Sequence, residues 1–196
     1  MQISELILVA FLVWQISAMP VPVWLATAFF GVDSEDYNTK AGWAENKYSF
    51  ENSKWSIIVF LVELFKGFAA ISLILVVTPE EVLLDGVPFR YVLALIAVLG
   101  HTFPIYNEFK RTFSMGAYFG IFAGLWMVPT VIALSIFSVI WIITKKVSIS
   151  SLIMAFGSLV IITFILTDVK ALVIAAILSS LLIFPNIKQR LEVVRA

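Results

Sequence analysis

The sequence has no cysteine and a single histidine, His101. Without cysteine the chain cannot form disulfides, thiolate nucleophiles, zinc–thiolate sites or palmitoylation sites, and one histidine cannot form a cluster of histidine ligands. Charged residues are scarce as well, at 13% of the chain, against about 25% in globular domains. The thirteen basic and thirteen acidic residues give a net charge of zero, so no overall field attracts nucleic acid or another acidic partner.

Apolar residues are abundant instead. They make up 61% of the 196 residues, against about 45–50% in globular domains, and the mean hydropathy is +1.03. A soluble protein of this size could not cover its surface with so few polar groups, so the composition predicts an integral membrane protein. Residues 1–20 contain no basic residue and the apolar run 6–30 is longer than the core of a signal peptide, which predicts a retained spanning helix.

Long apolar segments predict the transmembrane helices, because about 20 apolar residues cross the hydrocarbon core of a bilayer. Pro20 and Pro22 predict a bend in the first of these segments. Each of five segments fits one crossing, and the last is short: 6–30, 55–77, 87–105, 147–167 and 169–184.

Residues 115–144 form either one long helix or two helices divided near Trp126. One helix would be about 45 Å long, which exceeds a single crossing unless it is strongly tilted. Lys and Arg accumulate in cytoplasmic loops. Two helices place ten basic residues on one side and two on the other, whereas one helix places six on each side. We therefore predict an all-α, polytopic membrane protein with seven transmembrane helices, an N-terminus outside and a C-terminus in the cytoplasm.

We predict one transmembrane domain over residues 1–196, with a polar connection at 31–54 on the cytoplasmic side. Within the helix 55–77, Glu63 and Lys66 stand at i, i+3, so they share a face and can pair. Ionisable groups inside a span usually face the bundle interior or a polar cavity. Two interpretations remain open: the pair supports a polar site, or it is a structural ion pair alone.

The other polar candidates lie towards the predicted cytoplasmic side. His101, near the end of the helix 87–105, is either a hydrogen-bonded structural residue or a base. Lys110 and Arg111 suit lipid headgroups, and Ser148 suits a helix N-cap. Polar residues that converge at one leaflet favour a lipid-handling enzyme over a channel or carrier, which needs polar groups through the midplane.

Three segments together resemble the motifs of one family. The segment Glu63-Leu64-Phe65-Lys66-Gly67 resembles an Asp-x-x-Lys-Gly pattern, and Lys145-Lys146-Val147-Ser148 resembles a basic pair that precedes a Ser. The segment Gly100-His101-Thr102-Phe103-Pro104 matches a Gly-His-x-aromatic-Pro pattern, with Phe109-Lys110 at the expected distance. The chain resembles the PlsY family, the bacterial acyl-phosphate:glycerol-3-phosphate acyltransferases.

The resemblance implies a seven-helix protein of the bacterial cytoplasmic membrane that acts in phospholipid biosynthesis. In this family the glycerol hydroxyl attacks an acyl phosphate, without a metal, a cofactor or a covalent acyl-enzyme. Membrane lipids, acyl phosphate and glycerol 3-phosphate are the implied partners, and no nucleic acid is expected. The implied catalytic residues are His101, Lys110 and Ser148, and the implied phosphate-binding residues are Lys40, Asn46, Arg111 and Asn186.

The chain also departs from the family pattern. After Phe-Lys the family has Gly-Gly-Lys-Gly, a loop whose amides suit a phosphate, where this chain has Arg111-Thr112-Phe113-Ser114. The first motif keeps Ala44 and Asn46, and the tail has Pro185-Asn186 in place of Arg-His-Arg-Glu-Asn. Alternatives are therefore a non-catalytic relative that binds lipid or a partner protein, and an acyltransferase with another donor or acceptor. A small transporter fits the one-sided polarity less well.

Overall fold

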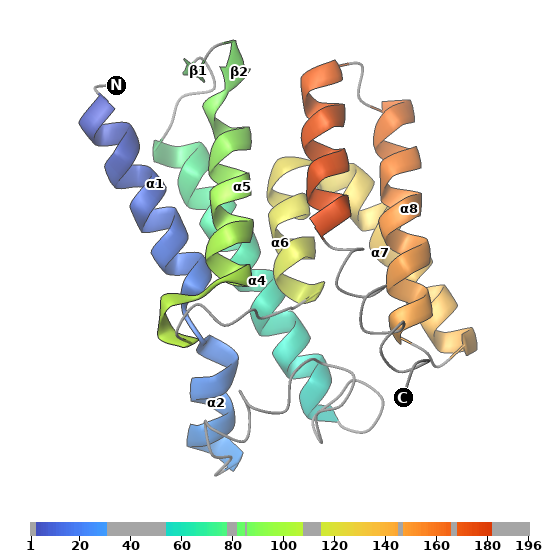
Figure 1. Ribbon diagram of the computed structural model, residues 1–196. Coiled ribbons are helices and arrows are strands. Elements are labelled where there is room, and N and C mark those ends of the chain that lie inside the picture. The colour runs from blue at the N-terminus through green and yellow to red at the C-terminus, as the bar shows by residue number, and fades with distance from the viewer. Residues whose placement is uncertain are drawn as a thin grey trace, which may run out of the picture. The chain divides into compact units, whose positions relative to one another are not determined.

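The computed structural model describes residues 3–30, 54–77, 82–84, 86–107, 115–144, 147–165 and 168–181. The chain divides into two compact units, residues 1–125 and residues 126–196. Each unit is built mainly of α-helices (Figure 1), as the composition predicts, and each is described by itself.

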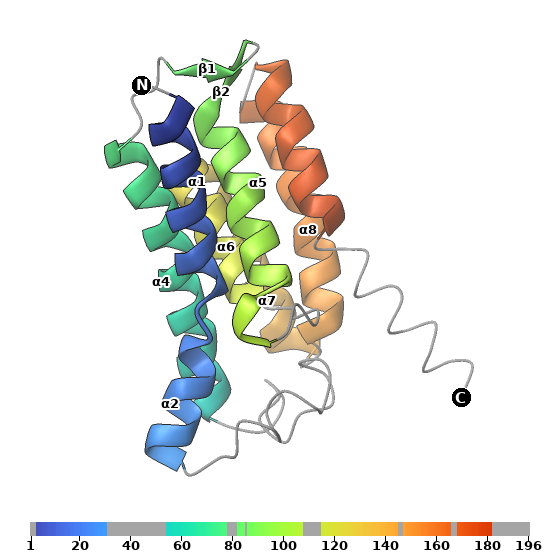
Figure 2. The ribbon, with the colours of Figure 1, turned by 60° about the vertical axis from the view of Figure 1, so that its left-hand side comes forward.

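The first unit is a helical bundle with a small hairpin at one end. In it α6 packs against α4, α1 packs against α5 and α4, and α2 packs against α4. Figure 2 shows α4 running alongside both α1 and α2. Its described elements are α1 (Ile3–Ala18), α2 (Val21–Phe30), α4 (Lys54–Val77), β1 (Leu83–Leu84), β2 (Val87–Pro88), α5 (Phe89–Thr102), a 3-10 turn (Ile105–Asn107) and α6 (Met115–Leu125).

The predicted first span, 6–30, is two helices. Met19 and Pro20 lie outside the helices, between the end of α1 and the start of α2. A proline has no N–H to donate and its ring opposes a helical turn before it, which explains why α1 ends here. The Trp24 N–H donates to the Pro20 carbonyl over 3.1 Å and begins α2. The predicted bend is therefore a complete break.

Glycines bring α6 and α4 into backbone contact. A Cβ atom added to Gly116 would lie 2.5 Å from the Phe60 carbonyl oxygen and 2.9 Å from the Glu63 Cβ. A Cβ on Gly120 would overlap the Leu64 carbonyl. Small residues that let backbones approach are typical of helix pairs in membranes. The contact covers the face of α4 that carries Glu63.

A short hairpin precedes α5. Leu83 pairs with Pro88 and Leu84 with Val87 in antiparallel register. Gly86, in the turn, has a φ of 77°, a conformation that side chains disfavour. The predicted helix 87–105 is therefore shorter at both ends, since it begins at Phe89 and ends at Thr102.

The second unit contains α7 (Met127–Thr144), α8 (Val147–Ile165) and a helix over Val169–Leu181. α7 packs against α8. The division of residues 115–144 into two helices is confirmed, because α6 ends at Leu125 and α7 begins at Met127. Pro129 stands in the first turn of α7, where a helix needs no N–H from it.

The exposed surface of α7 is almost entirely apolar. Its exposed serines, Ser135 and Ser138, donate their hydroxyls to the carbonyls of Val131 and Leu134 over 2.9 and 2.8 Å. These hydroxyls are satisfied without water. Among the described residues, Met127–Thr144 is the one helix found to be both long and apolar enough to cross a membrane.

Candidate functional site

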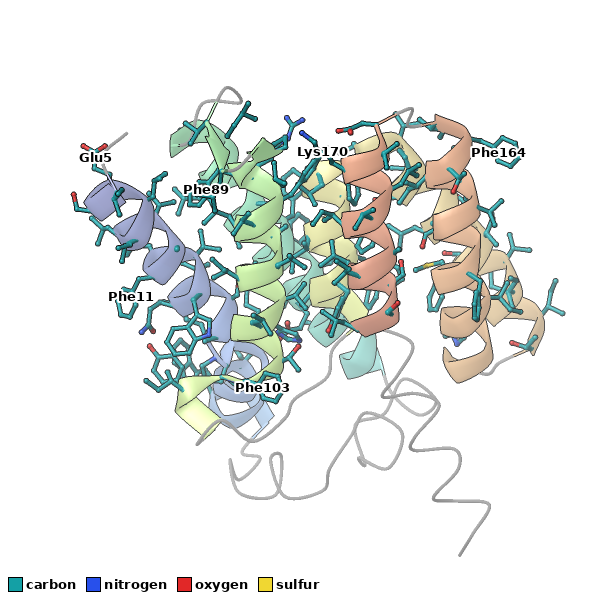
Figure 3. All side chains as sticks on the ribbon, turned by 45° about the horizontal axis from the view of Figure 1, so that its top comes forward. Glu5, Phe11, Phe89, Phe103, Phe164 and Lys170 are labelled. Atoms are coloured by element: carbon teal, nitrogen blue, oxygen red, sulfur yellow. The ribbon has the colours of Figure 1, made fainter. Side chains whose placement is uncertain are left out.

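Buried polar side chains of the first unit gather near the end of α5. Figure 3 shows Phe89 and Phe103 at opposite ends of this helix, with Glu5 of α1 at the Phe89 end. Glu63 and His101 are 4% and 5% exposed. Because His101 lies in the last turn of α5, the cluster sits at the Phe103 end, where the chain leaves the helix.

Glu63 and Lys66 form an ion pair on α4. The Lys66 ammonium donates a hydrogen bond to Oε1 of Glu63 over 3.1 Å and lies 2.9 Å from Oε2. Both side chains are at least nine-tenths buried. An isolated buried charge costs several kcal/mol, so each member depends on the other.

Lys66 also reaches the break between α1 and α2. Its ammonium donates to the main-chain carbonyl of Met19 over 3.0 Å. The last carbonyls of a helix have no partner within that helix and need one elsewhere. Lys66 supplies it here, so one side chain links α4 to the end of α1.

His101 is the third member of the cluster. Its Nδ1 lies 3.4 Å from the Lys66 ammonium and 3.5 Å from Oε2 of Glu63. The backbone of Ser17, in α1, also interacts with the ring. The Phe103 N–H donates a hydrogen bond to the Leu99 carbonyl over 2.8 Å and completes the last turn of α5. His101 therefore contacts α4 through Glu63 and Lys66, and α1 through Ser17.

Tyr118 of α6 lies against the His101 ring. The two rings meet edge to face, with centroids 6.3 Å apart and planes at 88°. The Tyr118 hydroxyl and the Thr102 hydroxyl are 3.2 Å apart and share a buried hydrogen bond. Sequence reasoning missed Tyr118. The signal was available, because a tyrosine in an apolar helix between two glycines needs a partner for its hydroxyl.

A second contact holds the chain just after the proline. The Tyr106 hydroxyl donates to the side-chain oxygen of Gln15 in α1 over 3.3 Å. The Tyr106 ring also meets the Trp24 ring of α2 edge to face, at 6.4 Å. The segment that leads towards Lys110 therefore starts from a fixed position beside the break.

The structure brings together Glu63, Lys66 and His101 among the predicted site residues. Ser148 stands in the first turn of α8, in the other unit, and its side chain is not described. Five predicted residues lie outside the described part of the chain: Lys40, Asn46, Lys110, Arg111 and Asn186. Their roles stay predictions.

The described cluster is suited to holding one imidazole in a defined orientation. It offers a carboxylate, an ammonium and a tyrosine ring around His101. No group of three or more His, Asp and Glu side chains that could hold a metal ion occurs among the described residues.

Known proteins are similar to this chain in sequence and in architecture. The family model for glycerol-3-phosphate acyltransferase matches residues 6–195. The glycerol-3-phosphate acyltransferase of Fusobacterium nucleatum is 36% identical over 145 residues, which cover 74% of this chain and 72% of that protein. The enzyme of the same name from Staphylococcus carnosus is 26% identical over 97% of this chain and 93% of its own length.

A solved structure has the same fold. It is a crystal structure of PlsY (YgiH), described as an integral membrane glycerol 3-phosphate acyltransferase in its glycerol 3-phosphate form. It superposes with a TM-score of 0.74 and covers 95% of this chain and 92% of its own, at 17% identity. At 17% identity this likeness shows that the two proteins share a fold, and nothing beyond the fold.

Proposed function

This chain belongs to the glycerol-3-phosphate acyltransferase family, and we propose that it is a membrane-bound member that transfers an acyl group from acyl phosphate to glycerol 3-phosphate. The glycerol hydroxyl oxygen loses its proton and attacks the acyl carbon, the bond from that carbon to the phosphate oxygen breaks, and inorganic phosphate leaves. The products are an acylglycerol phosphate and phosphate. This reaction would begin phospholipid synthesis.

One observation carries the proposal. Two of the three segments that resemble family motifs, 63–67 and 100–104, are distant in sequence but meet through Lys66 and His101 at 3.4 Å. The meeting point is the end of α5, from which the chain leads directly to Lys110. A histidine held at the end of α5, shortly before Lys110 and Arg111 in the sequence, suits the binding of phosphate groups.

A membrane location is supported by the surface of the second unit. The exposed side chains of α7 are apolar or are serines bonded to their own backbone, as hydrocarbon requires. The charge asymmetry of the sequence separately supports seven crossings and a cytoplasmic position for the His101 end of the bundle. The membrane would be the bacterial cytoplasmic membrane.

The altered loop favours a slow enzyme. Arg111-Thr112-Phe113-Ser114 lacks the glycines that allow several backbone amides to converge on one phosphate, and Phe113 stands where the family has a lysine. We expect turnover well below that of a family member with Gly-Gly-Lys-Gly. The same substitution supports a second candidate function, a non-catalytic relative that binds lipid or a partner protein.

The deciding experiment is an assay of the purified chain in lipid nanodiscs with acyl phosphate and glycerol 3-phosphate. Phosphate release and acylglycerol phosphate would be measured beside a family member with intact glycines. We expect slow turnover that Lys110→Ala abolishes. Absence of product, while the control enzyme turns over, would favour the non-catalytic candidate. Fast turnover that is insensitive to Lys110→Ala would contradict the placement of the site.

A further inference from the structure

The exposed side of α4 is apolar over a length close to the thickness of a bilayer. Its large exposed side chains are between 37% and 84% exposed and recur on one side of the helix: Ile58, Leu61, Phe65, Leu73 and Val76. From Ile58 to Val76 the helix rises by about 27 Å, and the hydrocarbon core of a bilayer is about 30 Å thick. This side of α4 therefore fits acyl chains along its whole length.

The ion pair with Glu63 lies near the middle of that length, on the buried side of α4. The Cα atom of Lys66 is about 12 Å along the helix from Ile58 and about 15 Å from Val76. Side chains of a helix lean towards its N-terminus, so the ammonium lies somewhat nearer to the Ile58 end. The charged groups are therefore well inside the apolar length of the helix.

Three other helices have one end at the level of this pair. The end of α1 meets Lys66 through the Met19 carbonyl, and the last turn of α5 meets it through His101. A Cβ atom on Gly116, in the first turn of α6, would lie 2.9 Å from the Glu63 Cβ. Figures 1 and 2 show these ends at a similar level, while α4 continues past them with α2 beside it. The cluster therefore lies partway along α4, where three helices end.

Beyond this level the surface of α2 is also apolar. This helix continues from the break for 10 residues without a charged side chain, a length of about 15 Å. It packs against α4, and its large exposed side chains, Trp24 and Phe29, are 52% and 74% exposed. A helix that is apolar on its exposed side as well as its packed side suits hydrocarbon. The boundary with water therefore lies farther out than the cluster.

The outer surface at the level of the cluster is apolar too. Leu99 and Phe103, at the end of α5, are 47% and 40% exposed. Figure 3 shows Phe11 on the outer side of α1, where it is 52% exposed. The polar side chains that follow at this end, Gln15 and Tyr106, bond to each other over 3.3 Å. Polar groups at hydrocarbon depth need such partners within the protein.

We infer that the cluster of Glu63, Lys66 and His101 lies about 10 Å inside the hydrocarbon core, and that phospholipid acyl chains cover the exposed side chains at its level. Lipid fits better than a second copy of the chain, because the exposed apolar surface extends over α1, α2, α4 and α5 and does not form one patch.

The inference rests on the proposed membrane location and deepens the proposed function. Glycerol 3-phosphate would have to pass below the lipid headgroups to reach His101. The acyl chain of the donor already lies at this depth. The two substrates would therefore approach the cluster from different surroundings, one from water and one from the bilayer.

Depth can be measured with spin labels, because the chain has no cysteine of its own. Single cysteines at Phe65, Leu99 and Phe103 would carry a nitroxide at the level of the cluster, and cysteines at Phe29 and Val76 would carry it near the two ends. The full chain would be reconstituted in liposomes of phosphatidylethanolamine and phosphatidylglycerol. Collisions of each nitroxide with O2, which concentrates in hydrocarbon, would be compared with collisions with a water-soluble nickel complex.

We expect the ratio of O2 to nickel collisions to be severalfold higher at the three central positions than at Phe29 and Val76. Three positions report on one level, so a variant that fails to fold in thermal unfolding leaves two others. A ratio at Phe103 no higher than at Phe29 would place the cluster at the boundary and overturn the inference. Few collisions with either reagent at the central positions would mean that protein covers this surface, and would also overturn it.

The measurement separates this inference from the proposed function. It needs no turnover, so an inactive chain with deep labels would count against acyl transfer and support the depth. A chain that does not float with the liposomes would contradict the membrane location and the depth together. Labels that enter the bilayer but stay shallow at Phe65, Leu99 and Phe103 would contradict the depth alone.

Discussion

The ammonium of Lys66 donates to the carbonyl of Met19 over 3.0 Å, although 47 residues separate them in sequence. Met19 stands at the break between α1 and α2. Pro20 creates the break, the break leaves a carbonyl without a helical partner, and a lysine of α4 satisfies it. Lys66 therefore joins the break between α1 and α2 to the Glu63–Lys66 ion pair, and the same ammonium contacts His101.

Removal of the lysine should destabilise the chain strongly. Lys66→Met leaves the Glu63 carboxylate buried without its counterion, which costs about 3–5 kcal/mol. Adding Glu63→Gln should recover much of that loss. Thermal unfolding in detergent would measure the loss of stability in Lys66→Met and its recovery in the double variant. Wild-type stability in each single variant would mean that the pair is solvated.

The glycine contact between α6 and α4 can be tested with a matched pair of substitutions. Gly120→Ala adds a Cβ that overlaps the Leu64 carbonyl and should cost about 1–3 kcal/mol. Gly157→Ala is the control, because a Cβ there meets nothing within 4 Å; it should be neutral or stabilise by up to about 1 kcal/mol. Equal melting temperatures for the two variants would argue against the close approach.

The Thr102–Tyr118 hydrogen bond should show coupling. Either Tyr118→Phe or Thr102→Val leaves a buried hydroxyl without this partner and should cost about 1–3 kcal/mol. The double variant should cost less than the sum of the two. Thr102→Ser keeps a hydroxyl and serves as the control. Strict additivity in chemical or thermal unfolding would mean that the two groups do not interact.

The membrane topology can be mapped with single cysteines, because the chain has none of its own. Cysteines at positions 38, 107 and 186 should react with an impermeant reagent only from the cytoplasm, and one at position 85 only from outside. The expectation follows from the ten-to-two distribution of basic residues. Labelling of positions 107 and 186 from opposite faces would indicate six crossings.

The sequence predicts the helices well because their causes are local. Apolar run length and the charge count place the helices and divide residues 115–144 near Trp126, where the structure has its break. The spacing of Glu63 and Lys66 likewise predicts a contact within one helix turn. The hairpin before α5 was missed, although an Asp-Gly pair at 85–86 is a known turn signal.

The surroundings of the site could not be predicted in the same way. The contacts of Lys66 with Met19 and of Thr102 with Tyr118 join different helices. Which side chains meet across helices depends on how closely the helices approach, and the glycine contacts of α6 set that distance for its pairing with α4 alone. No pattern within one helix encodes these partners. They follow only once the bundle is assembled.

The placement of both charges on α4 has a consequence for biogenesis. A lysine or glutamate that enters a membrane alone faces the full cost of an unpaired ion. Glu63 carries its counterion three residues away, so α4 is neutral across this stretch as soon as it has been synthesised. His101 follows 35 residues after Lys66 in the sequence. The helix can therefore insert before α5 exists, and the later contacts fix its rotation without having to neutralise it.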